Sequence, residues 1–201
     1  NAKINSHFLY NTLNTIKWQA ISQSQMDIAN SIVALTKILE YSCKNTLDMV
    51  ALREEIQFIE DYIYIQNMRY GSSVVVKYQI EDDCRECLVL KMLLQPIVEN
   101  ALIHAFDNSG EGNVITVTCK KNKGHMKISV YDNGRGFQYE GFDKLTGIGL
   151  NNIKDRLELN FGTESEMQIY SVIGEGTRVT IVFPIVEGGK AADESLTDRR
   201  R

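Results

Sequence analysis

The first seventy residues carry apolar residues at the spacing of amphipathic helices. These residues recur three and four positions apart, so each set forms a stripe along one helix face. Such stripes are typical of helices that pack against other helices. No proline precedes Pro96, and the polar stretches 22–25 and 45–48 are the expected turns. The stripes are Phe8, Leu9, Thr12, Leu13 and Ile16, then Ile28, Ile32, Leu35 and Leu39, then Leu52, Ile56, Ile59 and Ile63.

The pattern changes at Gly71 to that of an α+β domain. Runs rich in β-branched residues predict strands at 74–80, 114–120, 126–131, 167–173 and 177–184, the last two joined across Gly174-Glu175-Gly176. Apolar periodicity predicts helices at about 90–106 and 149–161. Residues 137–146 have no clear period and indicate a mobile loop. The tail from Glu187 consists of Gly, Ala and charged residues and is expected to be disordered.

Composition narrows the possible functions. Hydrophobic residues make up 43% and charged residues 24% of the 201 residues, which is typical of a soluble globular chain. The net charge of −4 does not favour general nucleic-acid binding. The longest apolar run, 88–103, is interrupted by Lys91, Gln95, Glu99 and Asn100, so it does not predict a membrane span. The chain lacks an initial Met and opens in a helical pattern, so we expect a fragment whose membrane connection, if any, lies in missing upstream segments.

The four cysteines do not form a recognisable zinc motif. Cys84 and Cys87 make a single CxxC, with no second pair to complete a metal site. Four reduced thiols in a cytosolic domain are therefore favoured over metal or redox chemistry.

Three motifs in the second half indicate a nucleotide site. In QPIVENALIH, Asn100 and His104 lie four residues apart on one helix face, and an amide oxygen can occupy one Mg²⁺ position. In DNGRGF, Asp132 follows a strand, and a buried carboxylate there can accept a hydrogen bond from an adenine amino group. In GIGLNN, backbone amides at a helix start favour phosphate. Each motif alone also fits a structural role, as a polar helix face, a turn or a helix start.

The order of these motifs resembles the N, G1 and G2 boxes of the GHKL ATP-binding fold, over roughly residues 72–186. The resemblance implies that Asn100 holds Mg²⁺ and that Asp132 reads adenine, with Thr177 of GEGT supporting Asp132. It further implies that His104 either assists the phosphates or makes a structural contact. The pocket and its lid would be shaped by Gly134, Gly136, Gly147, Gly149 and Leu150.

Hydrolysing members of this superfamily use a glutamate one turn before the Asn as the general base for water. That position is Pro96 here, which has no group to accept a proton. Glu99 is about 100° away from Asn100 around a helix, so it does not replace that base directly. A phosphoryl acceptor other than water is therefore favoured.

The opening segment supplies a candidate acceptor. A neutral imidazole is nucleophilic near pH 7, so His7 can attack a γ-phosphate, although a lone histidine is more often an ordinary surface residue. Its context, HFLYNTLN, closely resembles the phosphoacceptor box of LytS/YesM-like sensor kinases, as do VALREE and LLQPIVEN. By analogy Asn11 would position water for dephosphorylating a partner. The chain departs from the subgroup at Ser6, where proline is usual. Most histidine kinases have an acidic residue directly after the phosphoacceptor as a base; this chain has Phe8 there, so the base for His7 stays unidentified.

The resemblance implies an α+β protein: an N-terminal helical dimerisation and phosphoacceptor region followed by a GHKL (Bergerat) α/β sandwich. The expected domains are 1–48, a helical linker 49–71, the ATP-binding domain 72–186 and the tail 187–201. It further implies a sensor histidine kinase, the cytoplasmic region of a bacterial membrane protein. This kinase would use ATP and Mg²⁺ to phosphorylate His7, form a homodimer and pass the phosphoryl group to a response-regulator aspartate. A GHKL ATPase of another kind and a degenerate nucleotide-binding dimerisation module stay open as alternatives.

Overall fold

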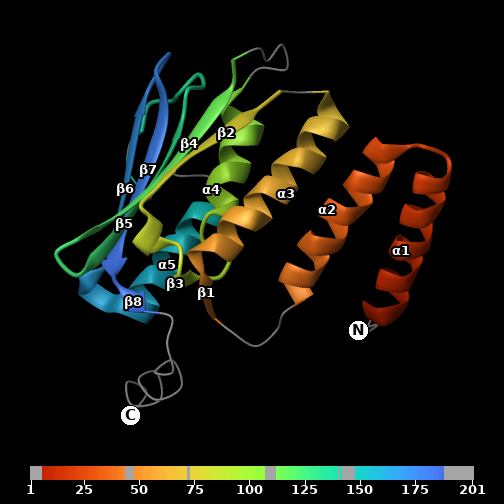
Figure 1. The fold of residues 1–201 in the computed structure, drawn as a ribbon. Helices are drawn as coiled ribbons and strands as arrows, with labels where there is room; N and C mark the ends of the chain where they lie inside the picture. The colour runs from red at the N-terminus through yellow and green to blue at the C-terminus, as the bar shows by residue number, and fades with distance from the viewer. Residues whose placement is uncertain are drawn as a thin grey trace. The chain divides into compact units, whose positions relative to one another are not determined.

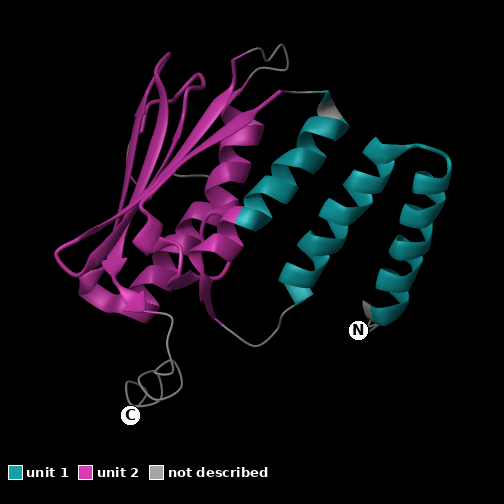
Figure 2. Ribbon diagram, viewed as in Figure 1, with its two compact units in different colours: residues 1–46, 57–72 teal, residues 47–56, 73–201 magenta. Residues whose placement is uncertain are grey.

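The computed structural model of the protein describes residues 6–43, 48–71, 73–106, 112–139, 141 and 148–187. It contains two compact units (Figure 2): residues 1–46 with 57–72, and residues 47–56 with 73–201. Helix α3 (Leu52–Tyr70) contributes residues to both units. The functional division at 1–48, 49–71, 72–186 and 187–201 stays a prediction. Within the described ranges, no helix combines the length and the apolar character that crossing a bilayer would require.

Unit 1 begins with a helical hairpin made of α1 (Ser6–Ser22) and α2 (Met26–Cys43) (Figure 1). The chain reverses where the polar stretch 22–25 predicts a turn. Ser24 adopts a left-handed φ of 58°, and the Gln25 amide donates to the Ala20 carbonyl at 2.9 Å. This bond satisfies one of the carbonyls that a helix end leaves without an intrahelical partner.

The part of α3 that belongs to unit 1 contacts α2 through an aromatic pair and an ion pair. The rings of Tyr41 and Phe58 lie 4.9 Å apart between centroids, and Phe58 stacks on Tyr62. Lys37 forms an ion pair with Asp61 at 3.5 Å, and Asp61 is nearly buried. These contacts make the third predicted helix part of the same helical unit.

Unit 2 is built on a five-stranded mixed sheet in the order β2-β4-β5-β7-β6. Only β2 and β4 pair in parallel; the other neighbours are antiparallel. A second, smaller sheet has the order β1-β3-β8. The five strands of the large sheet are Val75–Ile80, Val114–Asn122, His125–Asp132, Glu166–Val172 and Gly176–Pro184 for β2, β4, β5, β6 and β7; those of the small sheet are Met49–Ala51, Cys87–Leu90 and Val186–Glu187 for β1, β3 and β8.

One face of the large sheet is covered by α4 (Gln95–Asn100), its continuation η2 (Ala101–Ala105) and α5 (Ile148–Phe161) (Figure 1). Alternate residues of β4, β5 and β7 are buried beneath these helices, as the period of two in a strand predicts. Phe161 of α5 stacks on Phe183 of β7 with centroids 5.2 Å apart. The strand core consists of Ile115, Val117, Cys119, Met126, Ile128, Val130, Val179, Ile181 and Phe183.

The helix expected over residues 90–106 differs from prediction. It begins at Gln95, because Pro96 fits the first turn, where an amide hydrogen has no intrahelical partner. Residues 87–90 instead form β3, paired with β1 and β8. A four-residue apolar run reads equally well as buried strand or helix, so only the long-range pairing decides. From Ala101 to Ala105 the helix widens to a π-helical turn, which its sequence does not indicate.

We expect Phe183→Ala to lower the free energy of unfolding of unit 2 by about 3–5 kcal/mol, because it leaves a cavity between β7 and α5. Phe183 is fully buried. Urea denaturation followed by far-ultraviolet circular dichroism measures the effect. Tyr170→Ala, which removes an exposed ring from neighbouring β6, is the control. Equal effects of the two substitutions would contradict this assignment of the core.

Candidate nucleotide-binding site

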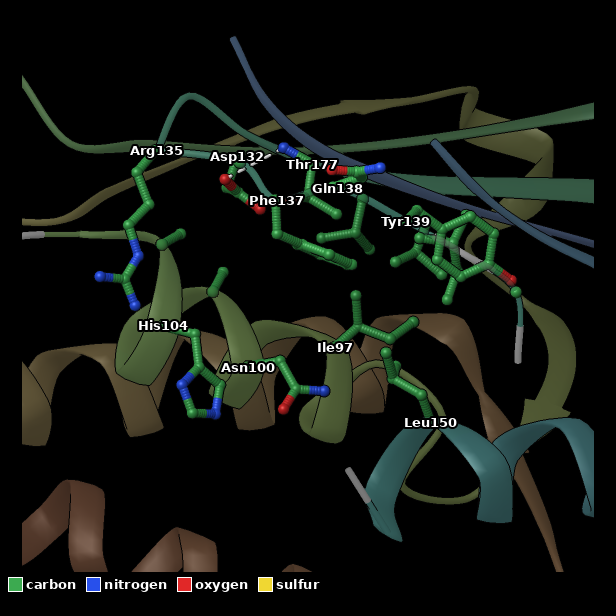
Figure 3. A pocket seen from close by; sticks show the side chains of 17 residues that line it. Ile97, Asn100, His104, Asp132, Arg135, Phe137, Gln138, Tyr139, Leu150 and Thr177 are labelled. Carbon is green, nitrogen blue, oxygen red and sulfur yellow. Dashed lines mark hydrogen bonds between the residues drawn. The ribbon is translucent and has the colours of Figure 1, made fainter. Parts of the chain in front are cut away.

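Unit 2 contains a cavity of about 500 Å³ between the large sheet and the helix formed by α4 and η2 (Figure 3). The sheet supplies one wall, the helix the other, and the first turn of α5 closes one side through Leu150. The cavity is large enough for a small-molecule ligand. Its lining residues are Ile97, Asn100, Ala101, His104, Ala105, Val130, Asp132, Arg135, Gly136, Phe137, Gln138, Tyr139, Gly141, Leu150, Ile169, Thr177 and Val179.

Asp132 is the last residue of β5 and is only 6% exposed. Its Oδ1 atom accepts hydrogen bonds from the backbone amides of Gly134 at 3.0 Å and Thr177 at 3.2 Å. Burial raises the pKa of this carboxyl above its usual range, although the hydrogen bonds from Gly134 and Thr177 act in the opposite direction. The side chain is therefore a fixed acceptor on the sheet wall of the cavity.

The two glycines of DNGRGF allow the loop after β5 to pass close to other backbone. Gly136 has a φ of +60°, and a Cβ there would collide with the carbonyl of Val172. A Cβ on Gly134 would collide with Ala105 of η2. The Arg135 amide between them donates to the Ala105 carbonyl at 2.8 Å. This loop thus joins the sheet wall to the helix wall, which requires glycine at both positions.

The GEGT hairpin holds the same loop from the other side. The Gly174 amide donates to the Arg135 carbonyl at 2.7 Å. Thr177 supports Asp132 through its backbone amide, whereas its hydroxyl lies 2.9 Å from the Ser171 hydroxyl. Ser171 also accepts a hydrogen bond from the Phe137 amide at 2.9 Å. The β6–β7 hairpin is therefore part of the site.

Asn100 and His104 both line the cavity, as their shared helix face suggests. Figure 3 shows the two side chains projecting from the same side of the helix. Asn100 ends the regular α-helix, and His104 lies in the π-helical turn that follows. A π turn inside a helix is often found at functional sites, because it shifts where the following side chains point.

Arg135 and Phe137 belong to the DNGRGF motif, but the sequence did not single out their side chains as functional. In Figure 3, Arg135 extends from the sheet side toward the turn that carries His104. Val130, Ile169 and Val179 form apolar sheet wall at inward strand positions. Strand alternation identifies such inward positions, but it does not distinguish a cavity wall from closed core. The remaining lining residues that the sequence did not indicate are Ile97, Gln138, Tyr139 and Gly141.

Other predicted site residues lie elsewhere. Gly149 does not line the cavity; a Cβ there would sit 3.1 Å from Pro96 Cβ, so it permits close packing of α5 on α4. Gly147 and most of the loop 137–146 lie outside the described residues.

His7 and Asn11 belong to unit 1, on the exposed surface of α1. The Asn11 Nδ2 atom lies 3.3 Å from His7 Nδ1, so the predicted one-turn spacing brings these groups together.

The CxxC pair is separate from the cavity lining. Cys84 and Cys87 are buried, and all four cysteines are free thiols. Burial raises the pKa values of Cys84 and of its neighbour Cys119, which favours neutral thiols.

Asp132→Asn should change how stability depends on pH. The pKa of Asp132 is raised in the folded state, so its protonated form stabilises the wild type. This stabilisation is complete below the pKa of the unfolded chain, about 3.9, and it is lost as pH rises through the folded-state pKa. The asparagine keeps Oδ1 but does not titrate. Relative to this variant, wild-type stability should therefore fall with rising pH across that window and then stay constant. Urea denaturation over a pH series measures this, with exposed Asp155→Asn as control. Parallel profiles for wild type and Asp132→Asn would refute the assignment.

Comparison with known families identifies both halves of the chain. Residues 1–74 match the histidine kinase family, and residues 89–187 match the family of histidine kinase-, DNA gyrase B- and HSP90-like ATPases. The sensor histidine kinase YesM of Bacillus subtilis is 36% identical over 185 residues, which are 91% of this chain and 32% of that protein. The sensor protein LytS of Staphylococcus saprophyticus is 32% identical over 197 residues, with the same coverage of 91% and 32%. The chain thus spans about a third of the length of these curated relatives.

Solved structures show the same fold. The histidine kinase domain of the blue-light activated histidine kinase EL346 from Erythrobacter litoralis has a TM-score of 0.54 at 19% identity, covering 90% of this chain and 86% of that one. The catalytic domain of the histidine kinase ThkA has a TM-score of 0.53 at 18% identity, covering 70% and 97%. Both confirm the α+β fold expected from the sequence.

The ATPase-type family implies ATP as the nucleotide. The helical N-terminal match, the ATPase-type match and the likeness to YesM and LytS agree with one another. The chain therefore belongs to the sensor histidine kinases of the LytS/YesM type, of which it carries the histidine kinase and ATPase-like regions.

Proposed function

We propose that unit 2 binds ATP with Mg²⁺ and that His7 of unit 1 receives the γ-phosphoryl group, which then passes to an aspartate of a response regulator. The observation that carries this proposal is the buried carboxylate of Asp132 in the wall of a cavity of about 500 Å³. A buried carboxylate normally needs partners, and the cavity leaves room for a ligand to supply one.

Asp132 would recognise adenine. Its carboxylate is an acceptor held in place by two backbone amides, and the adenine amino group is a donor. Guanine has a carbonyl oxygen at that position, which would leave two acceptors facing each other. The apolar side chains Val130, Ile169 and Val179 provide a surface against which a base can lie.

Asn100 would hold the metal. One amide oxygen suits Mg²⁺, which keeps several waters and takes its other ligands from phosphate oxygens. When bound, the metal would neutralise part of the phosphate charge that phosphoryl transfer must overcome. The donor set on this side of the cavity fits a polyanion, because His104 and Arg135 are the other nitrogen-bearing side chains there. We assign both of these residues to phosphate binding.

Hydrolysis by activated water is disfavoured by the residues around Asn100. Pro96 occupies the position of the base used by hydrolysing relatives in the superfamily. The Glu99 carboxylate accepts a hydrogen bond from the Gln95 side chain at 2.8 Å and does not line the cavity. Among the described lining residues, Asp132 is the sole carboxylate, and we assign it to the recognition of adenine. Within this described lining, water therefore lacks a carboxylate that could act as its general base.

His7 would be the nucleophile. In the transfer, an imidazole nitrogen forms a bond to the γ-phosphorus, the bond from that phosphorus to the β–γ bridging oxygen breaks, and ADP leaves with the electron pair. Asn11 Nδ2, 3.3 Å from Nδ1, would orient the ring. By analogy with the family, we also assign to Asn11 the positioning of a water molecule that removes phosphate from the partner regulator.

Unit 1 would form a homodimer through a four-helix bundle. Its two hairpin helices expose large apolar side chains, which burial against a second copy would remove from water. The exposed residues are Phe8, Ile16, Trp18, Ile21, Met26, Ile28, Val33 and Leu35. We also propose that this part of the protein is the cytoplasmic region of a membrane-anchored sensor kinase, as the family resemblance implies.

Incubation with γ-labelled ATP and Mg²⁺ tests the proposed transfer. Label should attach to the wild-type protein in an acid-labile, alkali-stable form, as a phosphoramidate does. His7→Gln should abolish labelling, because it removes the acceptor, yet it should leave nucleotide binding within about twofold since His7 lies outside unit 2. The matched control is His125→Gln. His125 is the first residue of β5, at the other end of the strand from Asp132, so this variant should be labelled normally.

Two outcomes would overturn the proposal. Phosphate release at equal rates in wild type and His7→Gln, with no protein label, would identify an ATPase. Failure of the wild type to bind ATP with Mg²⁺ would indicate a degenerate module that only assembles with partners.

A further inference from the structure

A four-residue turn, Lys91 to Leu94, leads from β3 into the helix that carries Asn100. Met92 in this turn has a left-handed φ of 58°, which is unfavourable for a residue with a side chain. Leu93 and Leu94 are fully buried. Contacts with other parts of the protein must therefore hold the turn in this shape.

Two of these contacts come from Glu55, in the first turn of α3. Glu55 is 1% exposed, and its two oxygens accept hydrogen bonds from the Met92 amide at 2.5 Å and the Leu94 amide at 2.9 Å. Leu94 is the N-cap residue of α4. Its carbonyl accepts hydrogen bonds from the amides of Ile97 and Val98. A helix start has unpaired amides and a partial positive charge, so an acidic side chain stabilises it. Glu55 thus caps α4 from a different helix.

Arg156 holds the same turn from α5. Its Nη2 atom donates to the Lys91 carbonyl at 2.7 Å. The first turn of α5 carries Leu150, which lines the cavity, and Gly149, which packs closely on Pro96. The two helices that border the cavity are therefore fixed to one turn, and that turn is fixed to Glu55.

We propose that Glu55 is a positioning residue for the nucleotide pocket, which sets the placement of Asn100 and Leu150 by clamping the turn 91–94 together with Arg156. Glu55 itself lies outside the cavity lining and touches no reacting group. This inference rests on the proposed binding of ATP with Mg²⁺ in that cavity. It assigns to the VALREE motif a role in nucleotide affinity that its position on the connecting helix does not suggest.

Glu55→Gln tests the clamp in the whole chain. Glutamine has nearly the same shape, but its NH₂ group would face one of the two amides, so one hydrogen bond is lost. We expect the dissociation constant for trinitrophenyl-ATP with Mg²⁺ to rise about tenfold, the change expected for losing a hydrogen bond to a charged acceptor. Glu60→Gln, an exposed position on the same helix, is the matched control and should change affinity less than about twofold.

Hydrogen exchange separates positioning from general stability. Without nucleotide and well below the unfolding temperature, Glu55→Gln should speed exchange in residues 91–100 while leaving the β5–β7 ladder protected. Arg156→Met should weaken nucleotide binding as well. The dissociation constant of the double variant should rise by less than the product of the two single fold-increases, because both residues act through the same turn. Glu55→Asp, which keeps the charge but shortens the reach, supplies a second variant if Glu55→Gln does not fold.

The inference fails if Glu55→Gln or Glu55→Asp lowers the unfolding temperature but binds trinitrophenyl-ATP within about twofold of the wild type; Glu55 would then only stabilise the fold. Absence of binding by the wild type is a different result, which overturns the proposed nucleotide site and this inference with it.

Discussion

The site depends on one constraint, the fixing of the Asp132 carboxylate by the backbone amides of Gly134 and Thr177. A carboxylate buried in a sheet wall is costly unless it is hydrogen-bonded. The two amides come from segments more than forty residues apart in the chain, so satisfying Asp132 joins the loop after β5 to the β6–β7 hairpin. Once these are joined, Arg135 and Gly136 pass between Ala105 and Val172, and the cavity acquires its walls.

The helix opposite Asp132 is placed by a second set of buried contacts. Pro96 starts α4, Glu55 caps it, and Arg156 ties the preceding turn to α5. All three lie outside the set of residues that would touch nucleotide. The sheet face of the cavity is thus held through Asp132 and the helix face through the turn 91–94, and the Arg135 amide links the two faces at Ala105.

The distinction between kinase and hydrolase rests on what is placed near Asn100. Pro96 serves as helix initiator in a position where a hydrolase needs a base, and Glu99 is bonded to Gln95. In the proposed mechanism, Pro96 therefore both starts the helix and leaves water without a base at that position. Helix α3 also has two structural roles. Its first turn caps α4, and its remainder packs on α2 in unit 1.

Much of this arrangement could be derived from the sequence. Period-two and period-three-to-four spacing depend on local geometry, so strands β2, β4, β5, β6 and β7 and helix α5 were predicted to within a few residues. Helices α1 and α2 were predicted by their apolar stripes and by the polar turn between them. The motifs also identified Asn100, His104, Asp132, Gly136, Leu150 and Thr177, which all line one cavity. The tertiary structure alone decided the rest. Strands β1 and β3 are too short to show a period and exist by pairing with each other. The π turn at η2 and the left-handed Met92 are held by neighbours distant in sequence. The roles of Glu55 and Arg156 depend on long-range hydrogen bonds, which no local pattern encodes.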